Sequence, residues 1–227
     1  MQHGRPVAIL GGVRIPFCRQ NTAYADVGNL GMSVRTLGAL VEQFGLHGQQ
    51  LGEVAMGAVI KHSSDWNLGR EAALSSGLSP LTPGITLQRA CGTSLDTIVH
   101  IAGKIATGQI EAGIGGGSDT TSDVPIVYGK SLRHRLLQAA AAKTTKAKLA
   151  AFKGFRFSEL KPDFPGVAEP RTGKSMGEHC EDMAKEWNIA RDSQDELAVA
   201  SHHKLAAAYA RGFFDDLVVS FRGVSRD

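Results

Sequence analysis

The chain has 227 residues and a formal net charge of +3, with 42% hydrophobic and 21% charged residues. That balance is typical of an ordinary globular protein with one or two domains. No apolar run approaches the length of a membrane span and the N-terminus lacks a basic-then-apolar signal, so we expect a cytoplasmic protein without a transmembrane segment. The three cysteines are odd in number and widely spaced, which fits neither a disulfide framework nor a zinc site.

Strands and helices alternate in the first half of the chain. Short apolar runs predict strands at Val7–Val13, Val54–Ile60, Ile85–Ala90 and Gly113–Gly117. Apolar residues at helical spacing predict helices at about 27–44, 68–76 and 95–105, each followed by a glycine that can end it, at Gly45, Gly77 and Gly108. This alternation is typical of β-α-β units, so we expect an α/β fold built on a largely parallel, buried sheet.

The pattern changes after Pro125. From there to about Gly173 the sequence predicts a long, irregular and basic stretch, in which nine Lys or Arg residues and a single acid, Glu159, lie between Lys130 and Lys161. Such a stretch could meet a phosphorylated ligand, nucleic acid or an anionic membrane. We place nucleic acid last, because no interleaved aromatic residues support it.

Regular elements return near the C-terminal end of the sequence. Apolar positions at helical spacing predict helices at about 176–187 and 192–208, the second of which is followed by Gly212. A last strand is expected at Leu217–Phe221.

The segment Gln88–Ser94 carries the chemistry that the sequence indicates. Cys91 lies where a predicted strand turns into a predicted helix, and the unpaired N–H groups and positive dipole end of that helix favour a thiolate over a thiol. The thiolate is the nucleophilic form of cysteine, and the backbone N–H of Cys91 could help to hold an oxyanion. Gly92 leaves room for a bulky substrate, and Thr93 or Ser94 can cap the helix.

Spacing alone leaves a second interpretation of Cys91 equally open, that of a small, inert core residue. Cys18, in a loop, and Cys180, on an apolar helix stripe, are interpreted as structural. His202 and His203 are adjacent on a helix and cannot chelate one metal ion as i, i+4 ligands would, so we expect no metal site.

Several motifs resemble those of the thiolase family. The matching segments are Arg14–Phe17, Ala90–Ser94, Ala112–Asp119 with Pro125, Ser175–Gly177 with Glu181–Ala184, and Arg191–Asp192 with Gln194–Asp195, Ser201–His202 and Ala206. They cover the chain nearly end to end, in the order and at the spacing of the family. Within the family, Pro125–Ile126, Gly129–Leu132 and Val167–Glu169 are most similar to the β subunits of fatty-acid oxidation complexes, including the trifunctional type.

The resemblance implies the thiolase fold, an α/β architecture in which a layered, mixed or parallel sheet lies between helices and carries an inserted loop domain. The implied domains are residues 1–124, the first part of the N-terminal thiolase domain; 125–175, the loop domain on the coenzyme A side; and 176–227, the remainder of the N-terminal domain. Thiolases also have a C-terminal domain that mirrors the first half and supplies a catalytic His and a second Cys, and we expect that domain to be absent from this chain. The chain would then be a fragment or a non-catalytic remnant.

The function implied by the resemblance is that of an enzyme, an acetyl-CoA C-acyltransferase (thiolase) of fatty-acid β-oxidation. Cys91 would attack the 3-keto carbon of a 3-ketoacyl-CoA, release acetyl-CoA and pass the shortened acyl group to a second coenzyme A. Ser175 and Met176 are the implied substrate-binding residues, and coenzyme A is a substrate, with no tightly bound cofactor. The cations of Lys130–Lys161 would suit a nucleotide phosphate, although a solvated loop is an equally open interpretation of any one of them.

The resemblance also implies a homodimer or homotetramer, with the α subunit of a fatty-acid oxidation complex as a candidate partner. Two alternatives stay open: a short-chain acetyl-CoA acetyltransferase (acetoacetyl-CoA thiolase), and a non-catalytic acyl-CoA-binding or assembly fragment. The sequence departs from the family pattern at Gly92, where this branch usually has Ala, and at Ala190, where a Ser cap is frequent. Ser175 stands where short-chain biosynthetic thiolases often have His, which favours a broader acyl range.

Overall fold

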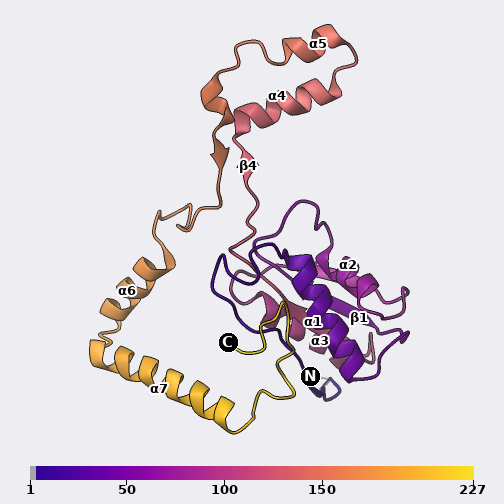
Figure 1. Ribbon diagram of the computed structural model, residues 1–227, viewed down its shortest axis with the longest axis vertical. Coiled ribbons are helices and arrows are strands. Elements are labelled where there is room, and N and C mark those ends of the chain that lie inside the picture. Colours follow the sequence, from indigo (N-terminus) through magenta and orange to yellow (C-terminus); the bar gives the residue numbers. More distant parts are fainter. Residues whose placement is uncertain (1–3) are drawn as a thin grey trace. The chain divides into compact units, whose positions relative to one another are not determined.

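The computed structural model describes residues 4–227 and divides into two compact units (Figure 1). The first unit comprises the described residues up to Asp123 together with Arg191–Asp227, and the second comprises Val124–Ala190. Among the described residues, no helix combines the length and the apolar character needed to cross a membrane.

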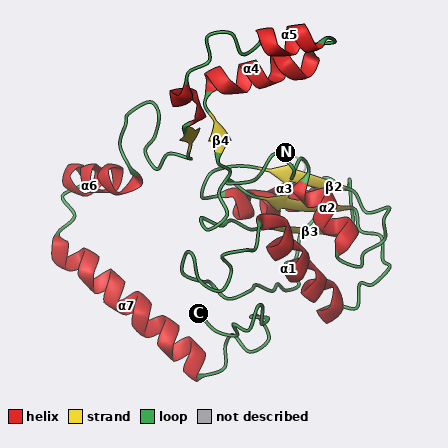
Figure 2. Cartoon of the chain, turned by 45° about the horizontal axis from the view of Figure 1, so that its top comes forward, coloured by secondary structure: helices red, strands yellow, loops and turns green. Residues whose placement is uncertain are grey.

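A three-stranded parallel sheet is the centre of the first unit (Figure 2). Its order is β2-β1-β3, with β1 at Glu53–Gly57, β2 at Gly84–Leu87 and β3 at Gly113–Gly117. In the register of the sheet, Ala55 lies opposite Ile85 on one side and Gly115 on the other. The predicted α/β fold with a parallel sheet is therefore confirmed.

Three helices connect and cover these strands, close to where the periodicity predicts them. They are α1 at Asn29–Gln43, α2 at Leu68–Ser75 and α3 at Thr93–Ala106. The glycines predicted to end them, Gly45, Gly77 and Gly108, all have positive φ, at 62°, 91° and 75°. Glycine adopts this left-handed conformation without the steric cost of a Cβ atom, which is why each helix ends where it does.

The strand β1 is buried on both faces, and its alternating residues point in turn toward the helices on one face of the sheet and toward α3 on the other. Val54 and Met56 pack with Leu37 and Val41 of α1 and with Ala72 of α2. This cluster is the larger hydrophobic core of the chain among the described residues, and it covers one face of the sheet.

The opposite face of the sheet meets α3 through glycines. A Cβ atom on Gly57 would lie 2.0 Å from Cγ2 of Thr93, and one on Gly115 would lie 2.8 Å from the Cα atom of Ile98. At Gly117 it would lie 2.7 Å from Oγ of Ser94. Because the absence of these Cβ atoms lets the two backbones approach, the glycines set how closely α3 lies against the sheet.

The two outermost strands expected from the sequence are not formed. The prediction of a strand at Val7–Val13 is wrong, and that of a strand at Leu217–Phe221 is wrong as well. Where these segments meet, the structure has an isolated bridge between Arg14 and Val218, with the N–H of Arg14 donating to the carbonyl of Leu217 at 2.8 Å. An apolar run forms a strand only if the edge of a sheet pairs with it, and the sequence of the run does not show whether such an edge is available.

Arg14 is held from the other end of the chain by Asp227. The Arg14 guanidinium reaches both carboxylate oxygens of Asp227, at 2.7 and 2.6 Å, and the Tyr209 hydroxyl donates to the same carboxylate at 2.8 Å. The hydrogen bond from Arg14, with that from the Phe17 N–H, outweighs burial and lowers the pKa of Asp227 to about 2. The family-like segment beginning at Arg14 is thus tied to the last residue of the chain.

The second unit is more regular than the sequence predicts. The stretch expected to be irregular contains α4 at Lys130–Ala141, α5 at Thr145–Ala150 and a 3-10 turn η1 at Phe157–Leu160, and β4 at Val127–Tyr128 pairs antiparallel with β5 at Pro162–Asp163. The expected irregular conformation of 125–173 is wrong in these parts, because the alanines around Ala139 favour a helix where glycines are absent. The helix α6 at Met176–Glu186 ends this unit, and α7 at Arg191–Ala210 returns to the first unit; both helices are as predicted.

We predict that Gly115→Ala lowers the free energy of unfolding by about 1–3 kcal/mol, because the new methyl group meets the backbone of α3 and not a flexible side chain. Urea denaturation measures the change. The matched control is Gly103→Ala within α3, where nothing lies within 4 Å of the new methyl group. That change should raise stability by up to about 1 kcal/mol, and equal losses in the two variants would contradict the close-approach argument.

Candidate active site

Cys91 follows β2 and immediately precedes α3, as the sequence predicts, and it is exposed. Its neighbour Gly92 is the N-cap residue of α3. The interpretation of Cys91 as a buried core residue is therefore wrong. An exposed cysteine beside the positive end of a 14-residue helix is accessible to a substrate and lies in a favourable field for an anion.

The turn that presents Cys91 is strained and is closed by Thr93. Ala90 has φ +41°, a left-handed conformation that costs a non-glycine residue about 1–2 kcal/mol. The buried Thr93 hydroxyl accepts from the N–H of Arg89 at 2.8 Å and donates to the carbonyl of Ala90 at 2.7 Å. These two bonds stabilise the turn on both sides of the strained residue.

The expected helix cap at Thr93 or Ser94 is wrong. Gly92 occupies the N-cap position, and Thr93 is already the first helical residue, so its hydroxyl points back into the turn. The sequence shows a Thr near a helix start but not whether the chain turns one residue earlier, and helix ends differ by a residue or two for that reason.

The loops that follow the three parallel strands are tied to one another at the edge where Cys91 lies. After β3, the Asp119 carboxylate accepts from the N–H groups of Val59 and Ile60, the latter at 2.7 Å, in the loop after β1. In that same loop, the Lys61 ammonium donates to the side-chain oxygen of Gln88, which follows β2, at 2.9 Å. Because parallel strands end at one edge of a sheet, this edge is the usual place for a ligand site in an α/β fold.

Ser118 joins this edge to α1. Its hydroxyl lies 2.8 Å from that of Ser33 and donates to the carbonyl of Asn29 at 2.9 Å, while its N–H donates to the carbonyl of Gly57 at 3.0 Å. The family-like segment Gly115–Asp119 therefore has two structural roles. Its glycines receive α3, and its polar residues connect the loops.

Ser175 and Met176 belong to the second unit. The Ser175 hydroxyl accepts from the N–H of Glu178 at 3.3 Å, and the Glu178 carboxylate accepts from the N–H of Ser175 at 2.7 Å, which is a capping box at the start of α6. The hydrogen bond from the Ser175 N–H lowers the pKa of Glu178. The motif Ser-x-x-Glu could have been recognised in the sequence as this cap. Met176, the first residue of α6, is exposed.

The far end of α3 is anchored by a charged cluster that the sequence does not reveal. The Glu53 carboxylate, whose side chain is 10% exposed, lies 2.7 Å from Nε2 of His100 and accepts from Nζ of Lys104 at 2.9 Å. Burial by itself would raise the pKa of Glu53, but the hydrogen bonds from Lys104 and His100 outweigh it and lower the pKa. The residues are 47 and 51 positions apart in the sequence, so only the packing of α3 on β1 brings them together.

The other cysteines and the two histidines considered in the sequence lie on elements other than the turn that carries Cys91. Cys18 is half-buried, whereas Cys180 is exposed on α6, so the structural interpretation has no packing support at Cys180. His202 and His203 are exposed on α7. No group of three or more metal-ligating side chains occurs among residues 4–227.

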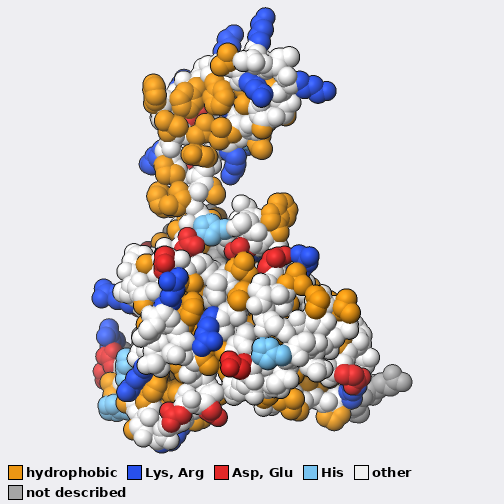
Figure 3. All heavy atoms as spheres, turned by 45° about the vertical axis from the view of Figure 1, so that its right-hand side comes forward, with side chains coloured by type: hydrophobic (Ala, Val, Ile, Leu, Met, Phe, Trp, Pro, Cys, Tyr) orange, Lys and Arg blue, Asp and Glu red, His pale blue; other side chains and the backbone are white. Residues whose placement is uncertain are grey.

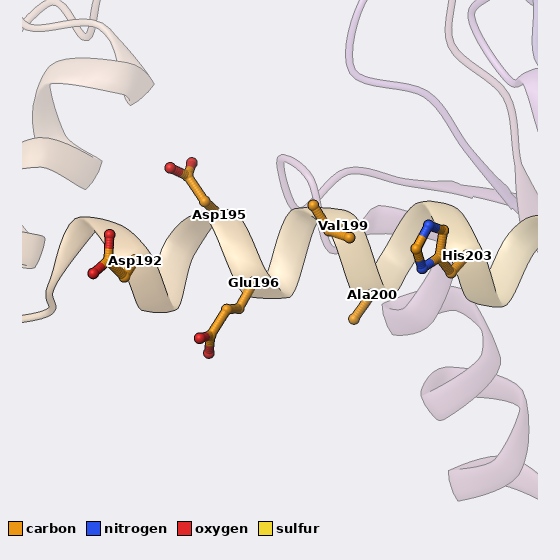
Figure 4. A pocket seen from close by; sticks show the side chains of 6 residues that line it. All are labelled: Asp192, Asp195, Glu196, Val199, Ala200 and His203. Atoms are coloured by element: carbon orange, nitrogen blue, oxygen red, sulfur yellow. The ribbon is translucent and has the colours of Figure 1, made fainter.

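A surface depression of about 480 Å³ on α7 does not form a second site. All six of its lining side chains come from this one helix, and Figure 4 shows Asp195 and Glu196 projecting from opposite sides of the ribbon. The lining residues are Asp192, Asp195, Glu196, Val199, Ala200 and His203. A single helix face has no opposing wall to enclose a ligand, so this depression is not a candidate active site.

Comparisons with known proteins show which family the chain is similar to. The family model described as "Thiolase, N-terminal domain" matches residues 7–227. The chain is 36% identical over 219 residues to a 3-ketoacyl-CoA thiolase of Photorhabdus laumondii, covering 96% of this chain and 50% of the relative. It is 37% identical over 216 residues to one from Shewanella amazonensis, covering 95% and 50%.

A solved structure is similar as well. The acetyl-CoA acetyltransferase of Bacillus anthracis superposes with a TM-score of 0.75 at 25% identity, over 96% of this chain and 51% of that one. The chain thus spans about half the length of the curated relatives and of the solved structure that it matches.

We predict that Thr93→Ala lowers the free energy of unfolding by about 1–3 kcal/mol, because the two part-buried hydrogen bonds of the Thr93 hydroxyl, from the N–H of Arg89 and to the carbonyl of Ala90, are lost. The same change should slow the alkylation of Cys91, since the turn is no longer held. Thr107→Ala is the matched control, because the Thr107 hydroxyl donates to the carbonyls of Gly103 and Lys104 at the exposed end of α3 and has no contact with the turn. An alkylation rate that falls equally in both variants would contradict the role of Thr93.

The Glu53 cluster predicts a specific pH dependence. The ordinary pKa of a Glu carboxyl group is 4.5, and in the folded chain the pKa of Glu53 is lower. The ionised carboxylate therefore stabilises the fold at pH values above 4.5, and this stability is lost as the pH falls through the pKa of the folded state. Glu53→Gln should lower the free energy of unfolding by about 1–3 kcal/mol at neutral pH, and the difference from the unmodified chain should shrink below about pH 4.5.

The control for this experiment is Glu111→Gln, which removes an exposed carboxylate paired with Arg5. Exposed ion pairs contribute little, so the free energy of unfolding should change by less than about 1 kcal/mol. A difference between Glu53→Gln and the unmodified chain that stays constant from neutral pH down to pH values well below 4.5 would refute the assignment.

Proposed function

Because the chain belongs to the thiolase family, we propose that it is the N-terminal half of a thiolase acyltransferase in which Cys91 is the nucleophile. The observation that carries the proposal is the position of this cysteine. Cys91 is exposed at the N-terminus of α3, on a turn fixed by Thr93, within the segment whose sequence resembles the thiolase nucleophile motif. No other cysteine of the described chain adjoins a helix N-terminus at the carboxyl edge of the sheet.

We propose thiolysis of a 3-ketoacyl-CoA as the reaction, by analogy with the 3-ketoacyl-CoA thiolases that the chain resembles. The Cys91 sulfur attacks the 3-keto carbon, and the bond between C2 and C3 breaks. The electron pair of that bond goes to C2, which takes a proton and leaves as acetyl-CoA. The sulfur of a second coenzyme A then attacks the acyl-Cys91 thioester, which forms the shortened acyl-CoA and frees the cysteine.

Oxyanion stabilisation is the contribution that this half can make to the reaction. Both attacks place negative charge on the carbonyl oxygen beside Cys91, where α3 presents the positive end of its dipole. The proton transfers need a base. We propose that a second half of the protein supplies it, because the resemblance implies that the C-terminal domain of a thiolase carries a catalytic His and a second Cys. The coverage of half of each relative supports this division.

An exposed apolar stripe on α3 supports the presence of a covering half. Leu95 and Val99 are exposed, and together with Ala102 they repeat at helical spacing on the side away from the sheet. A face of this kind is rarely left in water by a stable monomer. We propose that the second half of the protein packs there, within a homodimer or homotetramer, and that the α subunit of a fatty-acid oxidation complex is a candidate partner.

We also propose domain boundaries at 1–124, 125–175 and 176–227, a cytoplasmic location and a role in fatty-acid β-oxidation. Coenzyme A is proposed as a substrate, with Ser175 and Met176 near it, although the hydroxyl of Ser175 already serves the cap of α6. A substrate contact at Ser175 would therefore compete with that cap.

A short-chain acetyl-CoA acetyltransferase is the second candidate, and the similarity to the Bacillus anthracis enzyme favours it. A series of 3-ketoacyl-CoA substrates of rising chain length separates the two candidates when the protein includes its second half. Activity on long chains supports our proposal, and activity confined to the four-carbon substrate supports the alternative. Thiolysis by the 227-residue chain alone would refute both the need for a second half and the non-catalytic fragment.

We predict that iodoacetamide alkylates Cys91 faster than Cys180, although both cysteines are exposed. Cys180 is therefore an internal control for access, and a faster reaction at Cys91 reports activation of its sulfur. Peptide mass spectrometry of a time course measures both rates, and an acyl-CoA should protect Cys91 alone. Equal rates at Cys91 and Cys180, without protection, would count against Cys91 as the nucleophile.

A further inference from the structure

The hydroxyl group of Tyr24 is buried without a hydrogen-bond partner. Tyr24 is 7% exposed, and its Oη atom has no donor or acceptor in hydrogen-bonding geometry among the described residues. A phenol oxygen buried in this way costs free energy, because it has lost its bonds to water and has gained none in the fold. Such a group indicates that a partner comes from outside the folded polypeptide.

The hydrophobic cluster around Tyr24 contains one thiol, that of Cys18. Val27 and Met32 are buried in this cluster, and the centroid of the Phe221 ring lies 5.3 Å from that of the Tyr24 ring. Cys18 packs against the same cluster. Burial, and after it the Cys18 thiol, raises the pKa of Tyr24, so the phenol stays protonated and is able to donate a hydrogen bond.

The carboxylate of Asp227 does not supply the missing bond. Its charge also raises the pKa of Tyr24, but its oxygens are engaged elsewhere at 2.6–2.8 Å. The groups that donate to it are the guanidinium of Arg14, the N–H of Phe17 and the hydroxyl of Tyr209. The Tyr24 hydroxyl is therefore left facing apolar side chains and the sulfur of Cys18.

Cys18 and Tyr24 belong to one loop, which hydrogen bonds hold in place. The N–H of Asn21 donates to the Ser122 hydroxyl at 2.9 Å, and the Gln20 side chain donates to a backbone carbonyl of the loop after β3 at 2.7 Å. Both bonds lie between the cysteine and the tyrosine in the sequence. The loop therefore keeps the sulfur and the phenol beside each other.

Cys18 is a free, half-buried cysteine, so part of it is open to water and to small solutes. Exposure alone does not distinguish it, since Cys180 is more exposed, and Figure 3 shows side chains of the hydrophobic class, which includes cysteine and tyrosine, at the surface in many places. The distinguishing feature is the unpartnered donor beside its sulfur. No second cysteine belongs to the cluster around Tyr24.

We propose that Cys18 is a redox modification site, at which a hydroperoxide oxidises the thiol to a sulfenic acid that the Tyr24 hydroxyl stabilises. The sulfur attacks one peroxide oxygen, the S–O bond forms and the O–O bond breaks. The thiol proton goes to the leaving oxygen, which departs as water from hydrogen peroxide or as an alcohol from an alkyl hydroperoxide. The sulfur is oxidised and the peroxide is reduced, so no other reagent is needed.

Oxidation creates the acceptor that Tyr24 lacks. A thiol sulfur accepts hydrogen bonds weakly, whereas the oxygen of a sulfenic acid is an ordinary acceptor. The buried hydroxyl of Tyr24 then forms the bond that is missing in the reduced protein, and this bond stabilises the oxidised form. An exposed sulfenic acid is lost by further oxidation or by condensation with a second thiol, and the apolar cluster around Cys18 offers no second thiol.

The inference does not depend on the chemistry of Cys91. A Cys91→Ser chain removes the proposed nucleophile and leaves Cys18 and Tyr24 unchanged, so oxidation can be measured in that chain alone. Acyl transfer by Cys91 and a stable sulfenic acid at Cys18 can therefore fail separately.

Pulsed oxidation of the 227-residue Cys91→Ser chain tests the proposal. Hydrogen peroxide is removed with catalase, dimedone is added after increasing delays, and peptide mass spectrometry measures the trapped sulfenic acid at each cysteine. We expect the sulfenic acid at Cys18 to persist about threefold longer or more than that at Cys180, the internal control. Absence of trapping at Cys18, or equal persistence at the two cysteines, would overturn the proposal.

Tyr24→Phe removes the donor and keeps the ring. In this variant the sulfenic acid at Cys18 should be lost about threefold faster or more, while that at Cys180 should be lost at its former rate. The matched control is Tyr128→Phe, which removes a hydroxyl from a side chain that is 51% exposed and outside the cluster. Unchanged persistence in Tyr24→Phe, or an equal loss in the control, would overturn the role of Tyr24.

Urea unfolding gives a second readout, in a chain that carries Cys91→Ser and Cys180→Ser so that Cys18 alone is oxidised. In the reduced state, Tyr24→Phe should raise the midpoint, because an unpartnered buried hydroxyl is removed. Oxidation should raise the midpoint more in the chain with Tyr24 than in the Tyr24→Phe variant, since only the former gains the hydrogen bond. An equal or larger rise in the variant would overturn the proposal, and the comparison of Cys18 with Cys180 decides it if Tyr24→Phe does not fold.

Discussion

The structure of the first unit depends on how closely α3 approaches the sheet. Gly57, Gly115 and Gly117 all face this helix, and a methyl group on any of them would meet atoms of α3 or of the neighbouring strand within 2.8 Å. The helix axis is therefore set by backbone contact, which leaves far less freedom than side-chain packing does. Because Cys91 immediately precedes the N-cap of α3, this contact also fixes the height of its sulfur at the edge of the sheet.

The same constraint explains the strain before Cys91. The strand β2 is joined to the closely packed helix α3 by five residues, Gln88–Gly92, in which the chain must reverse its path, and Ala90 adopts a left-handed conformation there. Thr93 stabilises that conformation with two hydrogen bonds, and Asp119 holds the loop after β1 beside it. At the other end of α3, Glu53 fixes the helix to β1. The helix is thus held at both ends, which suits a site whose nucleophile must stay in place while its substrates change.

The sequence predicted the elements whose signals are local. The periodicity of α1 to α3, the glycines that end them and the position of Cys91 between β2 and α3 were all readable. The strands expected at 7–13 and 217–221 were wrong because pairing is a property of two segments. The contacts of Glu53 escaped prediction for the same reason, since they join residues that only the fold brings together. The bonds of Thr93 are local, and they escaped prediction because the sequence does not show at which residue α3 begins. The assignment of Ser175 and Met176 to the substrate stays a prediction.

Exposed apolar side chains have two different meanings in this chain, and charge distinguishes them. On α3 the stripe of Leu95 and Val99 carries no cation within it, and a face without charge gains from another protein face of the same kind. On the second unit, Leu149 and Phe157 stand among exposed Lys and Arg side chains, whose desolvation against a protein core would be costly. The stripe on α3 therefore suits burial under a second protein half, whereas the surface of the second unit keeps its charges in water.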